Sequence, residues 1–440
     1  MNFKKIFYSL LVSAVALSCA VSCCHAPCSK SKADAADRCK MKQFDITYFY
    51  GPRDADLTKR ETIANIAASG ITLMQLCGSP ESVKQALPIM AEYGLSGNVF
   101  DDRIMNLVSK NDPAAVDAVV KQVVEEYKDF ENVIGWEVTD EPNADRFPVL
   151  AEITKAFNKY APGKDVVINL FPNYASSEQL GTENYMTYLE KFASTVPTGV
   201  LSYDHYHFIG RNDRDRNLSL FHMLGLDERE RLIRLAAENT VDRGGFFENI
   251  EDIRKVALEY DMDPMLIVLL VEHGDYRNLT RAEILWEVNM CLVYGMKRLS
   301  YFTYWCPGPD EHWKWDNAMC DTQGNKMPHW YDVQAVNAEV ADIGKYLFKR
   351  KCKYVAHIGN VEKGAAEFAP YANILSAEGK DGVISFFDDD SIYLVNKDFK
   401  KEGTFMVKSR KPLKQYANGK FKRLNSETIT LGPGQGILLK

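Results

Sequence analysis

The sequence of 440 residues lacks the compact motifs that mark a cofactor or metal site. No glycine-rich phosphate loop follows the first predicted strand, where the chain reads YFYGPRDAD, so a dinucleotide-binding open sheet is disfavoured. No CxxC or HExxH pattern occurs in the part expected to fold, which gives no support for a zinc site. We find no internal repeat and no low-complexity tract. We therefore expect neither a metal ion nor a cofactor.

Positive charge is not in excess either. The chain has 53 Lys and Arg against 60 Asp and Glu, a formal net charge of −7 without an acidic tail. We find no basic cluster with interleaved aromatic residues, the pattern that suits nucleic acid or an anionic membrane surface. We therefore expect no nucleic acid as a partner.

Cysteine is scattered rather than patterned. Five of the ten cysteines fall within the first 39 residues, and the rest show no regular spacing, so no disulfide framework is expected. Cys306 and Cys320 could bridge one loop, but buried free thiols are the favoured interpretation.

The N-terminus is predicted to be a targeting segment. Residues 1–24 begin MNFKK, continue as the short apolar run IFYSLLVSAVALS and end among small residues and cysteines, a pattern typical of an export signal. Cys19 or Cys23 fits a bacterial lipobox loosely and would carry a lipid anchor; an ordinary cleaved signal is the alternative. Residues 25–43 read as a flexible tether. We expect an exported bacterial lipoprotein at the periplasmic face or the cell surface, with no other contact to a membrane.

From residue 44 onward, short apolar segments alternate with helical patterns. Eight strands separated by helices over about this length match a (β/α)8 (TIM) barrel, expected at 44–348. A doubly wound open sheet is the second possibility. The predicted strands are 44–51, 71–78, 95–101, 132–141, 165–172, 199–208, 265–274 and 298–305.

The last part of the chain changes character. Residues 353–440 show short alternating strands and turns without a helical period, which predicts a small antiparallel β-sandwich. The acidic run Asp388–Asp390 is expected to be a hairpin turn rather than a calcium site, since nothing nearby supplies the oxygen ligands that calcium needs.

Polar residues gather at the carboxyl ends of the predicted barrel strands. Because catalytic groups of a (β/α)8 barrel lie at that end, five polar strand ends on one rim predict a site there. The candidates for binding a substrate are Asp140, Asn169, Asn173, Tyr203, Asp204, His205, Tyr304 and Trp305.

Two acids stand out among these strand ends. Glu141 follows strand four and Glu272 follows strand seven, on opposite sides of the predicted ring. Two facing carboxyl groups suit glycoside hydrolysis, one donating a proton to the leaving oxygen and the other attacking the anomeric carbon. Asp140 and aromatic neighbours (Trp136, Tyr304, Trp305) would raise the pKa of Glu141. Glu272 would remain ionised, supported by Tyr203, His273 or Arg277.

Aromatic residues at the same rim favour a carbohydrate substrate. Trp305 ends strand eight, where its flat face could stack on a sugar ring. Trp313, Trp315 and Trp330 follow in the chain and could extend that surface.

The order of these motifs resembles the retaining glycoside hydrolases of clan A. GWEVTDEP, SYDHYHF and YGMKRLSYFTYWCPG are most similar to bacterial proteins grouped near the family-42 β-galactosidases, over roughly residues 44 to 345. The resemblance implies Glu141 as acid/base, Glu272 as nucleophile and Trp305 as a sugar platform. Clan A enzymes usually have asparagine where Asp140 stands, and a carboxylate cannot donate as an amide does.

Several alternatives stay open at this level. Glu141 could instead cap the helix that starts near Asn143, and Glu272 could pair with Arg277 or Arg281. An inverting hydrolase would use Asp140 or Asp204 as base. A barrel that binds carbohydrate without turnover is the alternative from outside the enzymes.

Overall fold

Eight parallel strands form the central sheet of the computed structural model, which describes residues 38–209, 242–309 and 314–440. The eight strands lie at the eight predicted positions. In spatial order they are β1 (Asp45–Phe49), β9 (Arg298–Phe302), β7 (Asp263–Leu269), β6 (Val200–Asp204), β5 (Asp165–Leu170), β4 (Val133–Asp140), β3 (Ser96–Phe100) and β2 (Leu73–Cys77).

The first and last strands of this order meet, which nearly closes the sheet into a barrel. The amide of Thr72 donates to the carbonyl of Ile46 at 2.9 Å, and the amide of Ile46 donates to Thr72 Oγ1 at 3.1 Å. The (β/α)8 interpretation is therefore confirmed, and the open doubly wound sheet is wrong.

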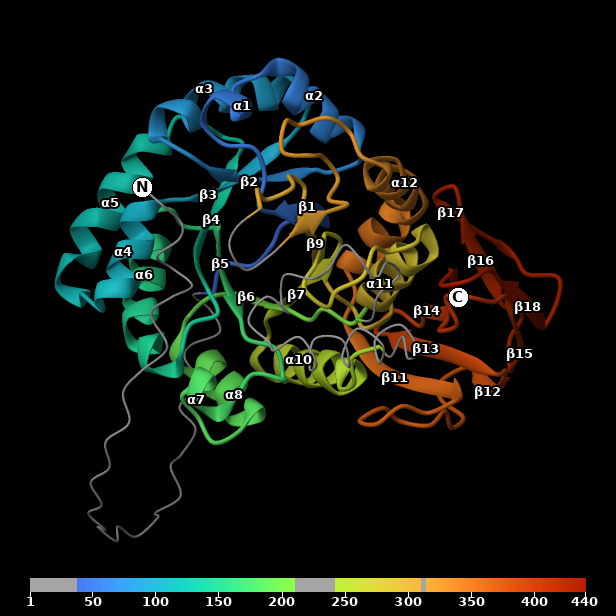
Figure 1. Cartoon of the computed structure of the whole chain (residues 1–440). Coiled ribbons are helices and arrows are strands. Elements are labelled where there is room, and N and C mark those ends of the chain that lie inside the picture. Colours follow the sequence, from blue (N-terminus) through green and yellow to red (C-terminus); the bar gives the residue numbers. More distant parts are fainter. Residues whose placement is uncertain (1–37, 210–241, 310–313) are drawn as a thin grey trace, which may run out of the picture. The chain divides into compact units, whose positions relative to one another are not determined.

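Helices surround the strands on the outside, as Figure 1 shows looking into the ring. Side-chain caps define several helix starts: Ser79 caps α3, Asp101 caps α4, and Thr280 with Glu283 forms a capping box on α11. The helices are α1 (Asp54–Leu57), α2 (Arg60–Ala68), α3 (Pro80–Glu92), α4 (Asp102–Lys110), α5 (Val116–Tyr127), α6 (Phe147–Tyr160), α7 (Ser177–Leu180), α8 (Tyr185–Thr195), α10 (Phe246–Tyr260), α11 (Arg281–Val293) and α12 (Pro328–Phe348), with short 3-10 turns η3 (Pro113–Ala115) and η4 (Ala144–Arg146).

The main core lies between the strands and this layer of helices. Trp136 of β4 stacks on Phe157 of α6 at 4.6 Å between ring centroids, and both are buried. The barrel interior is more polar: the buried Arg298 pairs with Asp165 at 2.6 Å. A buried charge of this kind is tolerated because it is paired.

Two antiparallel sheets follow α12, which confirms the predicted β region. One contains, in order, β11 (Cys352–Gly359), β13 (Asp381–Phe387), β14 (Ile392–Asn396), β19 (Gly436–Leu439), β16 (Lys414–Ala417) and β17 (Lys420–Arg423). The other contains β12 (Ile374–Glu378), β15 (Gly403–Ser409) and β18 (Thr428–Leu431). A second hydrophobic core fills the space between them, with Phe405 and Leu394 fully buried.

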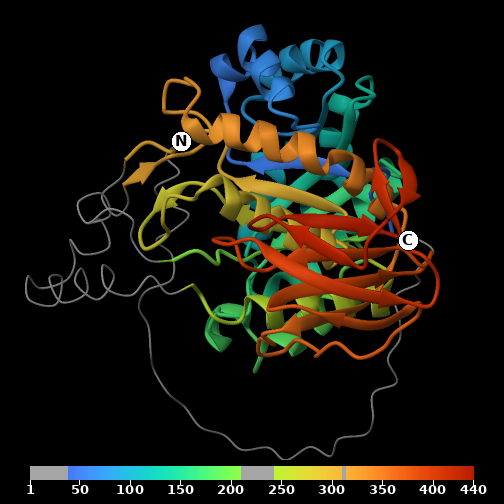
Figure 2. The ribbon, with the colours of Figure 1, turned by 90° about the vertical axis from the view of Figure 1, so that its right-hand side faces the viewer.

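Buried hydrogen bonds attach these sheets to the barrel helices. Asn289 of α11 donates to the carbonyl of Gly434 at 2.8 Å and accepts from the Tyr393 hydroxyl at 2.6 Å. Figure 2 shows α12 and the C-terminal sheets from this side. The described residues of the barrel and of these sheets lie within one compact unit.

Other predictions concern the cysteines, one turn, membrane spans and the leader. Cys306 and Cys320 are buried free thiols. Asp389 lies in the turn between β13 and β14, where it accepts from Ser391 and pairs with Arg350 and Lys440. In the described ranges no helix is long and apolar enough to cross a membrane. The predicted leader, with Cys19 and Cys23, lies outside the described residues.

Candidate active site

The carboxyl end of β4 carries an irregularity that aims its acidic residues. The pairing of β4 with β5 shifts by one residue between Glu137 and Thr139, after which Asp140 lies opposite Asn169. An extra residue in one strand bends it and redirects the side chains that follow. Asp140 consequently shares the orientation of Asn169 at the mouth of the barrel.

Glu141 has a backbone conformation that residues other than glycine rarely adopt. Its φ is 46°, which costs roughly 1–3 kcal/mol and persists only when the surroundings hold it. The Glu141 amide donates to the carbonyl of Asn169 at 2.8 Å, which fixes the turn. The helical cap here is Asn143, whose side chain accepts from the amide of Asp145 at 3.0 Å. The capping interpretation of Glu141 is therefore wrong.

Asn169 connects the ends of three strands through one side chain. Its Nδ2 donates to Asp140 Oδ1 at 2.9 Å and to Asp204 Oδ1 at 2.9 Å. Ser202 Oγ donates to Asn169 Oδ1 at 3.0 Å, which orients the amide so that both N–H groups face the acids. Asp140, Asn169 and Asp204 therefore form one hydrogen-bonded cluster, with Glu141 adjoining it.

The pKa values of all three carboxyl groups are raised from their ordinary range. Burial, then the charges of Asp204 and Asp140, raise the pKa of Glu141 well above its usual range. Burial and the neighbouring Asp140 raise the pKa of Asp204 to about 8, against the hydrogen bond from Asn169. Burial also raises the pKa of Asp140, but that side chain keeps solvent-exposed surface, so water weakens the effect. Close like charges and poor solvation both disfavour ionisation.

Glu272 lies on the side of the mouth formed after β7. The short strand β8 (Glu272–His273) pairs with β10 (Trp315–Asp316) above the barrel. Glu272 is 3% exposed, and Asn317 Nδ2 donates to its Oε2 at 2.6 Å. A donor aimed at a carboxylate oxygen stabilises the ionised form. The hydrogen bond from Asn317 holds the buried Glu272 carboxyl group in a fixed position.

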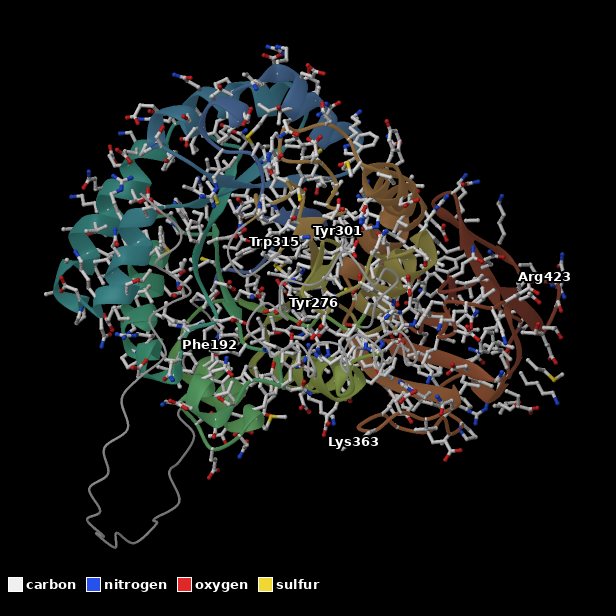
Figure 3. The ribbon with its side chains drawn as sticks, viewed as in Figure 1. Phe192, Tyr276, Tyr301, Trp315, Lys363 and Arg423 are labelled. Carbon is white, nitrogen blue, oxygen red and sulfur yellow. The ribbon has the colours of Figure 1, made fainter. Side chains whose placement is uncertain are left out.

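Aromatic rings form a wall beside Glu272. His273 stacks on Trp315 with 4.4 Å between ring centroids, and Tyr206 stacks on Phe302 at 5.2 Å. Tyr276 meets Tyr206 edge-on at 5.4 Å. Figure 3 shows Tyr276 and Trp315 toward the middle of the ring of strands. We call His273, Trp315, Tyr206, Phe302 and Tyr276 the aromatic wall.

Three predicted residues face away from the mouth. Tyr203 pairs with Leu266 on the outer face of β6 and is fully buried. Tyr304 is 1% exposed and packs against Tyr48 at 5.0 Å. Trp136 belongs to the core between β4 and α6. Tyr203 and Tyr304 are therefore not positioned to bind a ligand at the rim. Tyr304 and Trp136 were predicted to line the space around Glu141, and neither does. For Tyr203 and Trp136 the reason is the alternation of strand residues, which sends neighbours to opposite faces. Tyr304 lies beyond the end of β9 and packs into the main core there.

Asn173 and His205 have structural roles around the start of α10. Asn173 donates through its Nδ2 to the carbonyl of Gly245 at 3.0 Å. His205 Nδ1 lies 3.0 Å from Asn249 Oδ1, so this nitrogen carries the proton and the ring is neutral. Burial lowers the pKa of His205 to about 3. The predicted contacts of these two side chains with substrate are not supported by these positions.

The tryptophans predicted to form a platform separate into distinct environments. Trp305 is half-buried at the rim, and its amide donates to the carbonyl of Tyr50 at 3.1 Å. Trp315 joins the aromatic wall. Trp330 is 2% exposed in α12 and belongs to the core. Trp313 lies outside the described residues.

The structure adds residues that sequence reasoning missed. Tyr206 and Asn317 approach the two acidic sides of the mouth, and Arg243 lies over the Tyr174 ring at 4.1 Å while donating to the Tyr276 hydroxyl at 3.0 Å. Tyr206 alternates with Asp204 in the motif SYDHYHF, which was the available signal. Asn317 and Arg243 come from loops and carry no pattern of their own.

Two further expectations concern ion pairs and metals. Arg277 pairs with Glu283 and Asp242, each at 2.7 Å, which gives it a structural role near the loop after β8. Among the residues that the structure describes, no group of three His, Cys, Asp or Glu side chains is arranged to hold a metal ion.

No model of a known protein family matches the chain, and no curated protein matches it. Its fold is similar to that of a solved structure described as a glycoside hydrolase, with 10% identity, a TM-score of 0.51 and coverage of 90% of this chain and 92% of the other. A β-galactosidase from the psychrophilic Marinomonas ef1 has 10% identity and a TM-score of 0.48, with 70% of this chain covered; the match spans 62% of that enzyme. A putative α-L-fucosidase from Bacteroides thetaiotaomicron has 11% identity and a TM-score of 0.41, covering 77% of this chain and 99% of the other.

Proposed function

We propose that the chain is a glycoside hydrolase in which Glu141 is the general acid and Glu272 the nucleophile. The observation that carries the proposal is the difference between the surroundings of the two carboxyl groups. Burial and two neighbouring acids favour protonated Glu141, whereas Asn317 donates a hydrogen bond to Glu272. In a retaining glycosidase the acid must start protonated and the nucleophile ionised.

The proposed reaction proceeds in two balanced steps. The Glu141 proton moves to the glycosidic oxygen as that oxygen leaves the anomeric carbon, and a Glu272 oxygen forms an ester bond to the same carbon. Glu141, now ionised, then takes a proton from a water molecule whose oxygen attacks the anomeric carbon. The ester bond breaks, Glu272 is restored as an anion, and the sugar keeps its original anomeric configuration.

The aromatic wall gives this reaction a place to hold a sugar. Flat ring faces such as those of Trp315 and Tyr206 suit the apolar faces of sugar rings, while the carboxyl and amide groups of Asp140 and Asn169 suit hydroxyl groups. The fold shared with a protein described as a glycoside hydrolase supports the same assignment.

The inverting alternative finds less support. Asp204 is 5% exposed, and its pKa of about 8 leaves it protonated near neutral pH, whereas a catalytic base must be ionised. Asp140 is accessible to solvent and remains the base that an inverting mechanism would use.

A panel of aryl glycosides tests the proposal, with β-galactosides included because of the resemblance to family 42. We expect hydrolysis of at least one substrate, loss of 100-fold or more in Glu141→Gln and Glu272→Gln on a natural oligosaccharide, and no change in Glu178→Gln, an exposed control in α7. Proton NMR of the first sugar released distinguishes retention from inversion. Binding of a glycan without turnover of any substrate would instead favour the carbohydrate-binding barrel.

We also propose that the chain is exported and anchored through lipid on Cys19 or Cys23. Metabolic labelling with a fatty acid in a bacterial host tests this directly. Label on the wild type that is lost in one of Cys19→Ala and Cys23→Ala would identify the anchor, and absence of label would indicate a cleaved signal.

A further inference from the structure

The chain as a whole is acidic, but one part of the C-terminal sheets has the opposite charge. From Gly403 to Ser426 there are seven Lys and Arg and no Asp or Glu. All seven side chains are exposed: Lys408, Arg410, Lys411, Lys414, Lys420, Lys422 and Arg423. The overall net charge of −7 gives no sign of this basic segment. Tyr416 and Phe421 lie within the segment, so the expectation that the chain has no basic cluster with interleaved aromatic residues is wrong.

These charges lack the partners that basic residues have elsewhere in the protein. Lys159 pairs with Asp117 at 2.7 Å and Lys440 with Asp389 at 3.0 Å. Within the described ranges, no ion pair includes any of the seven. In the hairpin of β16 and β17, Lys414 lies directly opposite Arg423. Like charges in that position destabilise a sheet, so the hairpin retains a repulsion that an external anion would relieve.

The hairpin is nevertheless held firmly in place. Tyr416 and Phe421 contact Tyr346 of α12 at 5.2 Å and 5.4 Å between ring centroids. Lys440 Nζ lies 5.9 Å from the centroid of the Phe421 ring. The basic side chains therefore extend from an ordered support, as Figure 3 shows for Arg423 at the outer edge of the sheets.

A cavity of about 290 Å3 adjoins this hairpin. Its lining includes Gln415 of β16, Gln435 before β19 and β18 (Thr428–Leu431), together with the apolar Leu424 and Ile437. β18 is the outer strand of its sheet, paired only with β15 among the described strands, so its other edge is free of strand pairing. The Thr428 amide is used locally, since it donates to Ser426 Oγ at 3.0 Å. Amide, hydroxyl and backbone groups around a small hollow are suited to sugar hydroxyl groups.

Two of the basic residues lie on the same side of the hairpin as the cavity. Gln415 is the cross-strand partner of Lys422, and paired residues project from the same face of a sheet. Lys420 lies two residues from Lys422 and shares its face. Because Gln415 lines the cavity, Lys422 and Lys420 stand beside its opening.

We propose that this cavity and hairpin bind an anionic polysaccharide, with one uronate or sulfated sugar unit in the cavity and its charge against Lys422 and Lys420. Arg423 and Lys414 project from the opposite face of the hairpin, so they add positive charge nearby without lining the cavity. The preference for a glycan over other polyanions rests on the proposed glycosidase function, because a barrel that cleaves glycans gains from holding its substrate nearby.

Affinity gel electrophoresis with polygalacturonate, and with neutral galactan as the matched glycan, tests the proposal in the full-length protein. We expect retardation by polygalacturonate alone, weakened by added salt as charge-based binding requires. The triple variant Lys420→Gln, Lys422→Gln, Arg423→Gln should weaken it at least tenfold, and Gln415→Ala at least threefold. The control triple Lys121→Gln, Lys128→Gln, Lys155→Gln removes the same charge from exposed positions of the barrel and should bind as the wild type does.

Three results would overturn the proposal: no retardation by polygalacturonate, an equal loss in both triple variants, or equally strong binding of duplex DNA or of anionic phospholipid vesicles. Thermal unfolding of each variant confirms that its fold is intact. Since binding is measured without turnover, failure here leaves the barrel assignment standing, and an inactive barrel can still bind.

Discussion

Asp204 gives a prediction that needs no substrate. Its carboxyl group is 5% exposed and has a pKa of about 8 in the folded protein, compared with about 3.9 in an unfolded chain. A group whose folded pKa is raised contributes stability below its unfolded pKa and loses it as pH rises through the folded value. The wild type should therefore lose stability between about pH 4 and pH 8.

Asp204→Asn removes the ionisable group while keeping the shape and an oxygen that can accept from Asn169. A shift from 3.8 to about 8 corresponds to at most roughly 6 kcal/mol, at about 1.4 kcal/mol per unit. Asp140 and Glu141 contribute to the same charge repulsion, so the effect of Asp204 alone is smaller than this maximum. We expect the free energy of unfolding of the variant to exceed that of the wild type by an amount that grows by about 2–5 kcal/mol between pH 5 and pH 9.

Urea unfolding at pH 5 and at pH 9 measures this difference directly. Asp129→Asn, which removes an acid from an exposed loop, is the control and should show the same difference from the wild type at both pH values. If Asp204→Asn changed the free energy of unfolding by the same amount at pH 5 and at pH 9, the raised pKa of Asp204 would be refuted. The same variant should lose activity if the cluster serves catalysis.

Three further predictions follow from individual contacts. Asp140→Asn removes a charge that raises the pKa of Glu141, so the alkaline limb of the pH–rate profile should move down by about one pH unit; an unmoved limb would contradict this. Trp315→Ala opens the aromatic wall and should raise KM about tenfold with a smaller change in kcat, measured by initial rates, whereas unchanged KM would remove Trp315 from binding. Asn289→Ala leaves the buried Gly434 carbonyl and Tyr393 hydroxyl without their partner and should destabilise the protein by about 2–4 kcal/mol in urea unfolding; a loss under about 0.5 kcal/mol, typical of surface changes, would show that this contact does not matter.

The barrel was predictable because its signals are local and repeated. Each strand appears as a short apolar run, and each helix as a period of three to four, so eight repetitions reinforce one another. Glu141 and Glu272 could be selected as candidates because both follow such strands. The antiparallel sheets were recognised by their turns in the same way, although no pattern gave their strand order.

Orientation within the site could not be read from the sequence. Tyr203 and Asp204 are adjacent in β6, yet one faces the helices and the other the mouth, and the register that decides this depends on the closed sheet. The bulge before Asp140 and the bridging role of Asn169 arise from pairing between strands. Asn317 reaches Glu272 only because two loops pair above the barrel.

Chemical rescue with azide tests the paired roles of Glu141 and Glu272 most directly. With an activated aryl glycoside that the wild type cleaves, Glu272→Gly plus azide should yield a glycosyl azide of inverted configuration, because azide takes the place of the lost nucleophile. Glu141→Gly plus azide should yield a glycosyl azide of retained configuration, because the ester with Glu272 still forms. The same configuration from both variants, or no rescue of either, would contradict the assignment.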